Sequence, residues 1–314
     1  MKKGIVAVLL IIVVLLVTSL YPVTQNSTFN ISATFDNTFN QIIHIDNWKN
    51  WYPEIKNTYK TNPSAYHIST DSSKKIDTIT IPGKKIIVHA VTPMAYKVIE
   101  TGKNPENNFA FTVFPGATTN KMEIFFEKKV PLISTFFHGN PKTENPLEAL
   151  KNYLETPLEF YGYNIKMSEI RDTVIASCVI KTLLKDIFIK MQNTRQELME
   201  YLKDNDLQKT GFISVSYVPL QKDSIQITIG IPVNKRAAPS KDIQCLLLPP
   251  KGRVLVANYT GFFSQRIKIY QALTKYLTDH TLSIPAESFE RYLNDSLPSS
   301  DSSEIKMELD YPVY

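Results

Sequence analysis

The C-terminal half of the chain contains an internal repeat, and this repeat constrains the fold more than any other feature. Residues 225–233 read IQITIGIPV and residues 305–313 read IKMELDYPV, so a shift of 80 residues aligns the two segments. The same shift places residues 174–176 on residues 254–256. A repeat of this length indicates two copies of one structural unit that stabilise each other.

Each copy has the same predicted order of elements. A helix-like stretch follows the first strand of each copy, at residues 187–202 and 265–277, and a further strand ends near Tyr217 or Tyr292. Each copy is therefore predicted to form strand, helix, strand, strand. Two copies too small to bury their own apolar faces should pair about a pseudo-twofold axis and leave a groove between them. Such a groove is a natural place for a ligand.

Composition limits the class of protein. The chain has 314 residues, of which 43% are hydrophobic, enough for two domains and an anchor. The net charge is +5 and the basic residues are scattered, so no nucleic-acid partner is expected. Cys178 and Cys245 are too few for a disulfide scaffold; two free thiols are the preferred interpretation, and one bridge stays open.

The amino terminus resembles a membrane segment. Lys2 and Lys3 precede an apolar run that extends from residue 5 to residue 21, and no further Lys or Arg occurs before Lys49. This asymmetry predicts a single-pass anchor in the inner membrane, with everything after residues 1–22 on the extracytoplasmic side. A cleaved signal peptide is the alternative.

Residues 23–157 are predicted to form a first soluble domain. A polar tether leads to a strand through residues 29–35 and to a helix capped by Asp36 or Asn37. Trp48 and Trp51 in the string DNWKNWYP are interpreted as core residues. Alternating or apolar runs predict five more strands, at residues 76–81, 85–91, 94–100, 109–114 and 121–130. The domain closes with a helix whose apolar stripe is formed by Leu147, Leu150 and Leu154.

This order resembles the START-like polyketide cyclase and lipid-transfer superfamily (SRPBCC), also called helix-grip proteins. The resemblance rests on the strand ISA at residues 31–33, on Trp48 and the string WYP at residues 51–53, and on LKNYLE at residues 150–155. It implies an antiparallel sheet over a terminal helix, with a cavity for a hydrophobic molecule. Pro157 shortens the closing helix, which leaves the size of any cavity open.

Residues 158–314 resemble the GyrI-like small-molecule-binding domain, which is also the effector-binding domain of AraC-type regulators. The resemblance rests on YTGFF at residues 259–263, ERYLND at residues 290–295 and LDYPV at residues 309–313. It implies an acidic side chain in an aromatic-walled groove that receives cationic or polarisable ligands, and the matching acidic residue is Glu290. The groove residues expected beside it are Tyr292, Tyr259, Phe262 and Tyr217. The family's regulators carry a DNA-binding segment that this chain lacks, so a direct role in transcription is not expected.

Strand alternation independently singles out Glu290. Glu290 and Tyr292 share one strand face, and if helices cover the Phe289 and Leu293 side, the Glu290 side faces the groove. A carboxylate beside aromatic rings can hold a cation by charge and by the ring quadrupole. The competing interpretation is an exposed strand glutamate paired with a lysine. Glu308 has Thr228 as its repeat equivalent. It lies on the same strand face as Lys306 and Asp310, and this face is expected to be solvated.

Several kinds of chemistry leave no signal in the sequence. The five histidines are dispersed without metal-ligand spacing, and neither a phosphate-binding loop nor a nucleophile elbow occurs, so neither a metal nor a cofactor is expected. The whole pattern favours an α+β, membrane-anchored, extracytoplasmic protein that binds a small hydrophobic or cationic molecule without turnover. Two alternatives are a hydrolase with Glu290 as general base and an envelope scaffold that contacts another protein. The sequence names no ligand, protein partner or oligomeric state.

Overall fold

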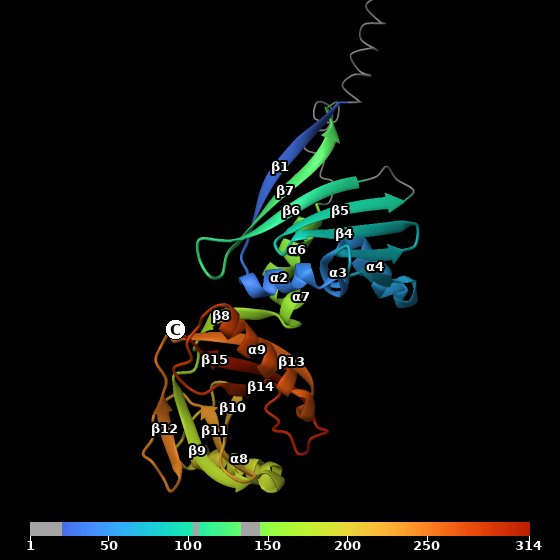
Figure 1. The fold of residues 1–314 in the computed structure, drawn as a ribbon. Coiled ribbons are helices and arrows are strands. Elements are labelled where there is room, and N and C mark those ends of the chain that lie inside the picture. Colours follow the sequence, from blue (N-terminus) through green and yellow to red (C-terminus); the bar gives the residue numbers. More distant parts are fainter. Residues whose placement is uncertain (1–20, 103–106, 133–144) are drawn as a thin grey trace, which may run out of the picture. The chain divides into compact units, whose positions relative to one another are not determined.

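A computed structural model describes residues 21–102, 107–132 and 145–314. The chain divides into two compact units, Met1–Thr156 and Pro157–Tyr314. Each unit is an α+β domain built on one antiparallel sheet, as the sequence predicts (Figure 1).

The described part of the first unit forms a seven-stranded antiparallel sheet with helices on one of its faces (Figure 1). The strand order is β1-β7-β6-β5-β4-β3-β2. In chain order the elements are β1 (Pro22–Ile31), α2 (Phe35–Ile43), α3 (Trp48–Trp51), α4 (Pro53–Thr61), β2 (His67–Asp71), β3 (Ile76–Ile81), β4 (Lys84–Thr92), β5 (Ala95–Gly102), β6 (Asn107–Pro115), β7 (Met122–Pro131) and α6 (Pro146–Glu155). The five strands predicted between residues 76 and 130 are confirmed.

The two tryptophans fill the core of this unit, as predicted. Trp48 is fully buried and its indole Nε1 donates to the backbone oxygen of Ile42 at 3.0 Å. Its ring stacks on Tyr52 with the centroids 5.3 Å apart. The closing helix α6 buries Leu147, Leu150 and Leu154 and ends at Glu155, before Pro157. The START-like resemblance itself stays a prediction.

Two details at the start of the unit differ from the sequence prediction. Strand β1 begins at Pro22 and runs through the supposed polar tether, because β7 supplies backbone partners along its whole length. Most of its side chains remain exposed or half-buried. The cap of α2 is Thr34, whose hydroxyl accepts from the backbone amide of Asn37 at 3.2 Å, and not Asp36 or Asn37. Strand β2 and helix α4 were not predicted; β2 has almost no buried side chain to signal it.

The predicted membrane anchor, residues 5–21, lies outside the described residues except for Tyr21. Within the described ranges, no helix has both the length and the apolar character that crossing a membrane requires.

The second unit is an eight-stranded antiparallel sheet with the strand order β12-β9-β11-β10-β14-β15-β13-β8. Its elements in chain order are α7 (Pro157–Tyr161), β8 (Ile165–Glu169), β9 (Val174–Leu183), α8 (Ile187–Asp204), β10 (Ile213–Pro219), β11 (Ser224–Pro232), β12 (Ile243–Leu247), β13 (Arg253–Phe262), α9 (Ile267–Asp279), β14 (Phe289–Tyr292) and β15 (Glu304–Pro312). The predicted order of strand, helix, strand, strand is confirmed in both halves.

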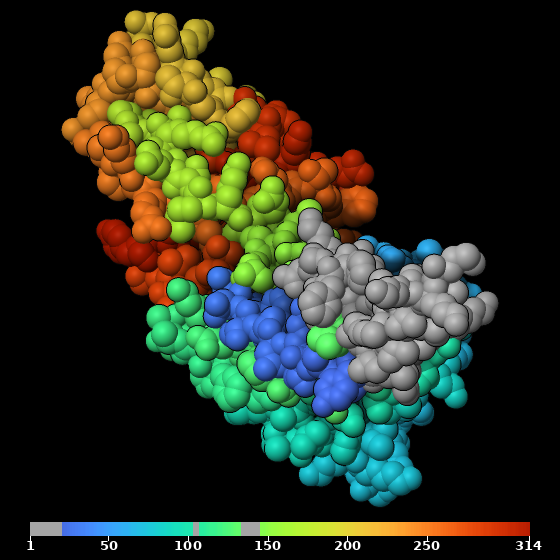
Figure 2. All heavy atoms as spheres, turned by 90° about the horizontal axis from the view of Figure 1, so that it is seen from above, coloured from blue at the N-terminus to red at the C-terminus, as the bar shows by residue number. Residues whose placement is uncertain are grey.

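The two halves exchange their leading strands. Strand β8, which precedes the first half, pairs with β13 of the second half, and β12, which precedes the second, pairs with β9 of the first. Figure 2 shows the result: yellow-green atoms from the start of the unit lie against orange atoms from beyond residue 250. The pairing of β10 with β14 joins both halves into one sheet, and the exchange gives each half an outer strand from the other.

Strand pairing also identifies equivalent positions in the two halves. With β11 and β15 related by 80 residues, the register of β10 on β11 and of β14 on β15 makes Val215 equivalent to Glu290, and Tyr217 equivalent to Tyr292. Strands β10 and β14 lie side by side at the centre of the sheet. The pseudo-twofold axis therefore passes between Tyr217 and Tyr292.

Candidate functional site

Glu290 lies inside the second unit, in the central strand β14. Its side chain has no exposed surface, although its repeat equivalent is the apolar Val215. Tyr270 of α9 donates its hydroxyl to Glu290 Oε1, which places the helix on the Glu290 face of the sheet. The condition for Glu290 to face an open groove, helices on the Phe289 side, is therefore not met by α9. The α9 helix packs on the opposite face because that face of β15 carries the apolar Met307 and Leu309 side chains next to β13.

Each oxygen of the Glu290 carboxylate accepts at least one hydrogen bond. Oε1 accepts from Arg266 Nε at 2.9 Å and from the Tyr270 hydroxyl at 2.8 Å, and Oε2 accepts from the Tyr292 hydroxyl at 2.5 Å. The Tyr217 hydroxyl lies 3.2 Å from that of Tyr292. Because the Tyr292 proton is directed to Glu290, the Tyr292 oxygen is left to accept in this second contact, and the Tyr217 hydroxyl also lies 3.8 Å from Met191 Sδ. The carboxylate is thus the end of a chain of donors that crosses the pseudo-twofold axis.

The three phenols are held in their protonated, donating form. Burial first, and then the negative charge of Glu290, raise the pKa of Tyr270 and of Tyr217 well above the ordinary value. Burial and the neighbouring Tyr217 and Glu290 do the same to the pKa of Tyr292. At neutral pH the three phenols beside Glu290 and Arg266 are therefore neutral.

Arg266 is the cation of the site and its most exposed charged member. It immediately precedes α9, and 22% of its side chain is exposed, against none of Glu290. Its guanidinium carbon lies 3.5 Å from the ring centroid of Phe263 and 5.2 Å from that of Tyr217. Burial, the largest single influence, acts to lower the pKa of Arg266, but the charge of Glu290, its hydrogen bond and the neighbouring Tyr217 and Tyr292 together raise the pKa by more. Glu290, Phe263 and Tyr217 thus form an anionic, aromatic site whose occupant is the chain's own guanidinium.

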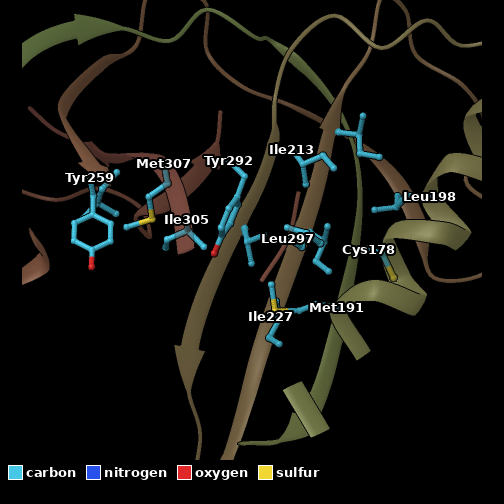
Figure 3. Close-up of a cluster of buried hydrophobic side chains, with 14 of the residues drawn as sticks. Cys178, Met191, Leu198, Ile213, Ile227, Tyr259, Tyr292, Leu297, Ile305 and Met307 are labelled. Carbon is cyan, nitrogen blue, oxygen red and sulfur yellow. The ribbon is translucent and has the colours of Figure 1, made fainter. Parts of the chain in front are cut away.

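The structure brings together three of the five residues expected in the groove. Glu290, Tyr292 and Tyr217 share the hydrogen-bonded chain described above. Tyr259 lies two strands away on β13, and its hydroxyl donates to the backbone oxygen of Phe262 at 2.8 Å. Figure 3 shows Tyr259 separated from Tyr292 by Met307. The Phe262 side chain is 43% exposed and points away; its neighbour Phe263 is the ring in the site.

Sequence reasoning missed the two residues of the α9 region that bind the carboxylate. Arg266 and Tyr270 are four positions apart at the start of the helix, so they lie on one helix face. That spacing was available in the sequence. What it could not show was which strand the face meets, because this depends on the pairing of the two halves.

A second charged cluster occupies the other face of the same strands. Arg291 pairs with Glu308 through Nη2 and lies 2.9 Å from Asp310 Oδ2 through Nε. All three side chains are at least nine-tenths buried. The expectation that Glu308 and Asp310 lie on a solvated face is therefore wrong. Their ion pairs with Arg291 offset part of the free-energy cost of burying the two side chains.

No set of three His, Cys, Asp or Glu side chains suited to a metal ion occurs among residues 21–102, 107–132 and 145–314. Cys178 and Cys245 are free thiols, which is the preferred sequence interpretation. The hydroxyl of Tyr201 lies 3.9 Å from Cys245 Sγ.

Comparison with known proteins gives likeness in structure only. No protein-family model matches the chain, and no curated protein matches it. The C-terminal domain of EcmrR is 18% identical and covers 48% of this chain and 98% of its own length, with a TM-score of 0.41. SAV2435 bound to tetraphenylphosphonium is 15% identical over 48% of this chain and 93% of its own, with a TM-score of 0.32. A hydrolase from Listeria innocua is 10% identical over 48% and 91%, with a TM-score of 0.33. Likeness at this level does not identify what this chain binds.

Proposed function

We propose that the second unit is a GyrI-like binding domain whose ligand is a small hydrophobic cation, and that the ligand takes the place of the Arg266 guanidinium beside Glu290. The observation that carries the proposal is the asymmetry of this ion pair. The carboxylate has no exposed surface, whereas its cation lies at the solvent-accessible edge on an aromatic ring. The anion is fixed in the core and the cation is the part that can leave.

The position of Arg266 favours exchange. A positive charge at the start of a helix is opposed by the helix dipole, by about 0.3–1 kcal/mol. Removing one partner of a buried ion pair costs about 3–5 kcal/mol, because the other charge is left unpaired. A ligand cation avoids this cost, since it restores the pair as Arg266 leaves. A neutral ligand of the same shape would leave the Glu290 charge unpaired.

The proposal is tested by titrating the protein with tetraphenylphosphonium and with the neutral triphenylphosphine oxide. We expect Glu290→Gln to weaken binding of the cation by about 1.5–3 kcal/mol, since a charged partner is lost. Binding of the neutral compound should be nearly unchanged. Arg266→Ala should increase the affinity for the cation by about tenfold or more, because the Arg266 guanidinium no longer competes for Glu290. Lys268→Ala is the matched control, as it removes one positive charge from an exposed position in the same helix.

Two outcomes would contradict the proposal. Equal losses for both compounds in Glu290→Gln would show that Glu290 does not select charge. Failure of Arg266→Ala to gain affinity would show that Arg266 is a permanent part of the core. The second outcome would support the envelope scaffold, a candidate that the filling of the site by Arg266 also favours.

The hydrolase alternative gains no support from the geometry. A general base must reach the proton of a substrate or of a water molecule. Both oxygens of Glu290 already accept hydrogen bonds, and its side chain has no exposed surface. We therefore propose binding without turnover.

We also propose that the protein is anchored in the inner membrane with both units on the extracytoplasmic side. The support is the sequence pattern alone: Lys2 and Lys3, the apolar run at residues 5–21, and the first following basic residue at Lys49. A periplasm-dependent reporter fused after Tyr314 should be active, and the fusion should fractionate with membranes. Activity of a cytoplasm-dependent reporter at the same position would contradict this topology.

A further inference from the structure

The connection between β14 and β15 is longer than the equivalent connection in the first half of the repeat. Equivalent residues are 75 positions apart on β10 and β14, but 80 positions apart on β11 and β15. Residues 295–303, here called the strap, therefore contain five residues more than the turn at residues 220–223. Because the first half forms the same unit without these residues, the repeated framework does not require them.

At one end the strap is bonded to α8 and enters the core on the helix-covered face of the sheet. Gln192 of α8 donates through Nε2 to the backbone oxygens of Leu297 at 3.1 Å and of Pro298 at 3.4 Å. The Leu297 side chain is 4% exposed and belongs to the same buried cluster as Met191 and Tyr292 (Figure 3). The strap thus contributes an apolar side chain to the core around the phenols of the candidate site.

At its other end the strap is bonded to the segment that carries Arg266. The backbone oxygen of Ser303 accepts from the amide of Phe263 at 2.9 Å, and that of Asp301 accepts from the amide of Ser264 at 3.0 Å. Phe263 is the ring on which the Arg266 guanidinium lies. The strap therefore extends from α8 of the first half to the start of α9 in the second half.

The strap is a polar segment with a small apolar contact. Five of its nine residues are serine, and Leu297 and Pro298 are its buried members. The hydroxyl of Ser303 accepts from two backbone amides of the strap itself, so these bonds need not break when the strap moves. Asp295, paired with Lys209, fixes the end next to β14. Segments with few buried apolar contacts are the ones that open locally.

We propose that the strap gates the candidate site: it opens as a local unit, and its opening gives a hydrophobic cation access to Glu290. The inference rests on the proposed cation site, because Glu290 has no exposed surface and a ligand can reach it only when a covering segment moves. When the strap opens, Leu297 leaves space for the apolar part of the ligand. Lids of this kind close a site to water as well as to ligand.

Amide hydrogen exchange of the full-length protein tests the opening without any ligand. The amides of Phe263 and Ser264 report it, since both donate to strap oxygens. We expect Gln192→Ala to accelerate their exchange by about fivefold or more, because both bonds from α8 to the strap are lost. Gln196→Ala is the matched control, as it changes the same residue type one turn further along α8 at an exposed position, and should have no effect.

Stopped-flow fluorescence with ethidium, a hydrophobic cation, tests access to the site. Deletion of residues 297–301 leaves a four-residue turn like that at residues 220–223. Ethidium should associate with the shortened protein at least about tenfold faster than with wild type, because no conformational change precedes binding. If the shortened protein does not fold, Leu297→Ala replaces it and should accelerate association in the same direction.

Two results would overturn the proposal: unchanged exchange at Phe263 and Ser264 in Gln192→Ala, or an unchanged association rate in the shortened protein. Binding of ethidium by the shortened protein alone would support the gate, since wild type would then be held closed. Absence of ethidium binding in both proteins would contradict the cation site, whereas accelerated exchange in Gln192→Ala would still support the local opening of the strap.

Discussion

Two buried carboxylates on opposite faces of β14 and β15 are held in contrasting ways. Glu290 accepts hydrogen bonds from a guanidinium and two phenols, so both of its oxygens have donors. Asp310 has one oxygen near Arg291 and one without a donor among the described residues. The charged form of Asp310 therefore has fewer hydrogen bonds to stabilise it than that of Glu290.

Asp310 should make the stability of the protein depend on pH. Burial, followed by the charge of Glu308, raises its folded-state pKa from an ordinary 3.8 to about 7, against the opposing charges of Arg291 and Arg171. Because the folded state holds the proton more tightly, this contribution to stability is fully present below pH 3.8 and is lost as pH rises through about 7. A difference of this size corresponds to on the order of 4 kcal/mol.

Denaturant unfolding between pH 4 and pH 8 measures this effect as the difference between wild type and Asp310→Asn. The stability of wild type relative to the variant should fall as pH rises across that range and become constant above it. Glu304→Gln should run parallel to wild type. A constant difference between wild type and Asp310→Asn would show that Asp310 is ionised throughout.

At the scale of single residues, the sequence predicted the acidic and aromatic members of the site better than its cation. Strand alternation places Glu290 and Tyr292 on one face, and the repeat places Tyr217 at the position equivalent to Tyr292. Arg266 was missed because its partner comes from another element, 24 residues away in sequence. The burial of Asp310 was missed because residues 170–172 cover that face of the sheet, and a strand pattern alone does not reveal such a cover.

At the scale of elements, close packing between neighbouring strands imposes a requirement for glycine at position 230. A β-carbon added to Gly230 would lie 2.6 Å from Ile175 Cγ2 and 3.0 Å from Ser214 Oγ. Gly230 of β11 and Ile175 of β9 are both in strands that pair directly. The absent side chain is therefore what lets Ile175 pack over β11.

Gly230→Ala should destabilise the protein by about 1–3 kcal/mol, the usual cost of overpacking a buried site. The same change in an Ile175→Ala background should cost nothing or stabilise, because the atom in the way is gone. Free energies of unfolding for the four proteins of this double-mutant cycle check the prediction. Equal costs in both backgrounds would mean that backbone conformation, and not contact with Ile175, requires the glycine.

Elements with clear periodicity were predictable, and those defined by their partners were not. Strand β3 was expected at residues 76–81 and is found there, since its apolar side chains alternate into the core. Strand β1 was placed too late because its polar side chains are mostly exposed and only pairing with β7 defines it. The exchange of β8 and β12 between the halves leaves no mark in local sequence, because either leading strand could pair within its own half.

At the scale of the whole molecule, each unit contains its own sheet and its own core. The seven strands of the first unit pair only among themselves, as do the eight strands of the second. The proposed cation site is built from residues beyond Pro157. Independent folding units with self-contained cores are expected to fold when separated.

Residues 21–156 and 157–314, expressed separately, should each unfold in one cooperative transition. The first fragment must begin at residue 21, because a later start removes the end of β1 that pairs with Val130 and Pro131. The second fragment should bind tetraphenylphosphonium within about twofold of the full-length protein, since Arg266, Glu290 and the surrounding rings all lie inside it. Chemical denaturation followed by fluorescence and by circular dichroism should give coincident transitions for each fragment.

A second fragment that folds but binds the cation much more weakly than the full chain would show that the first unit contributes to the site. If neither fragment folds, the two units depend on each other for stability.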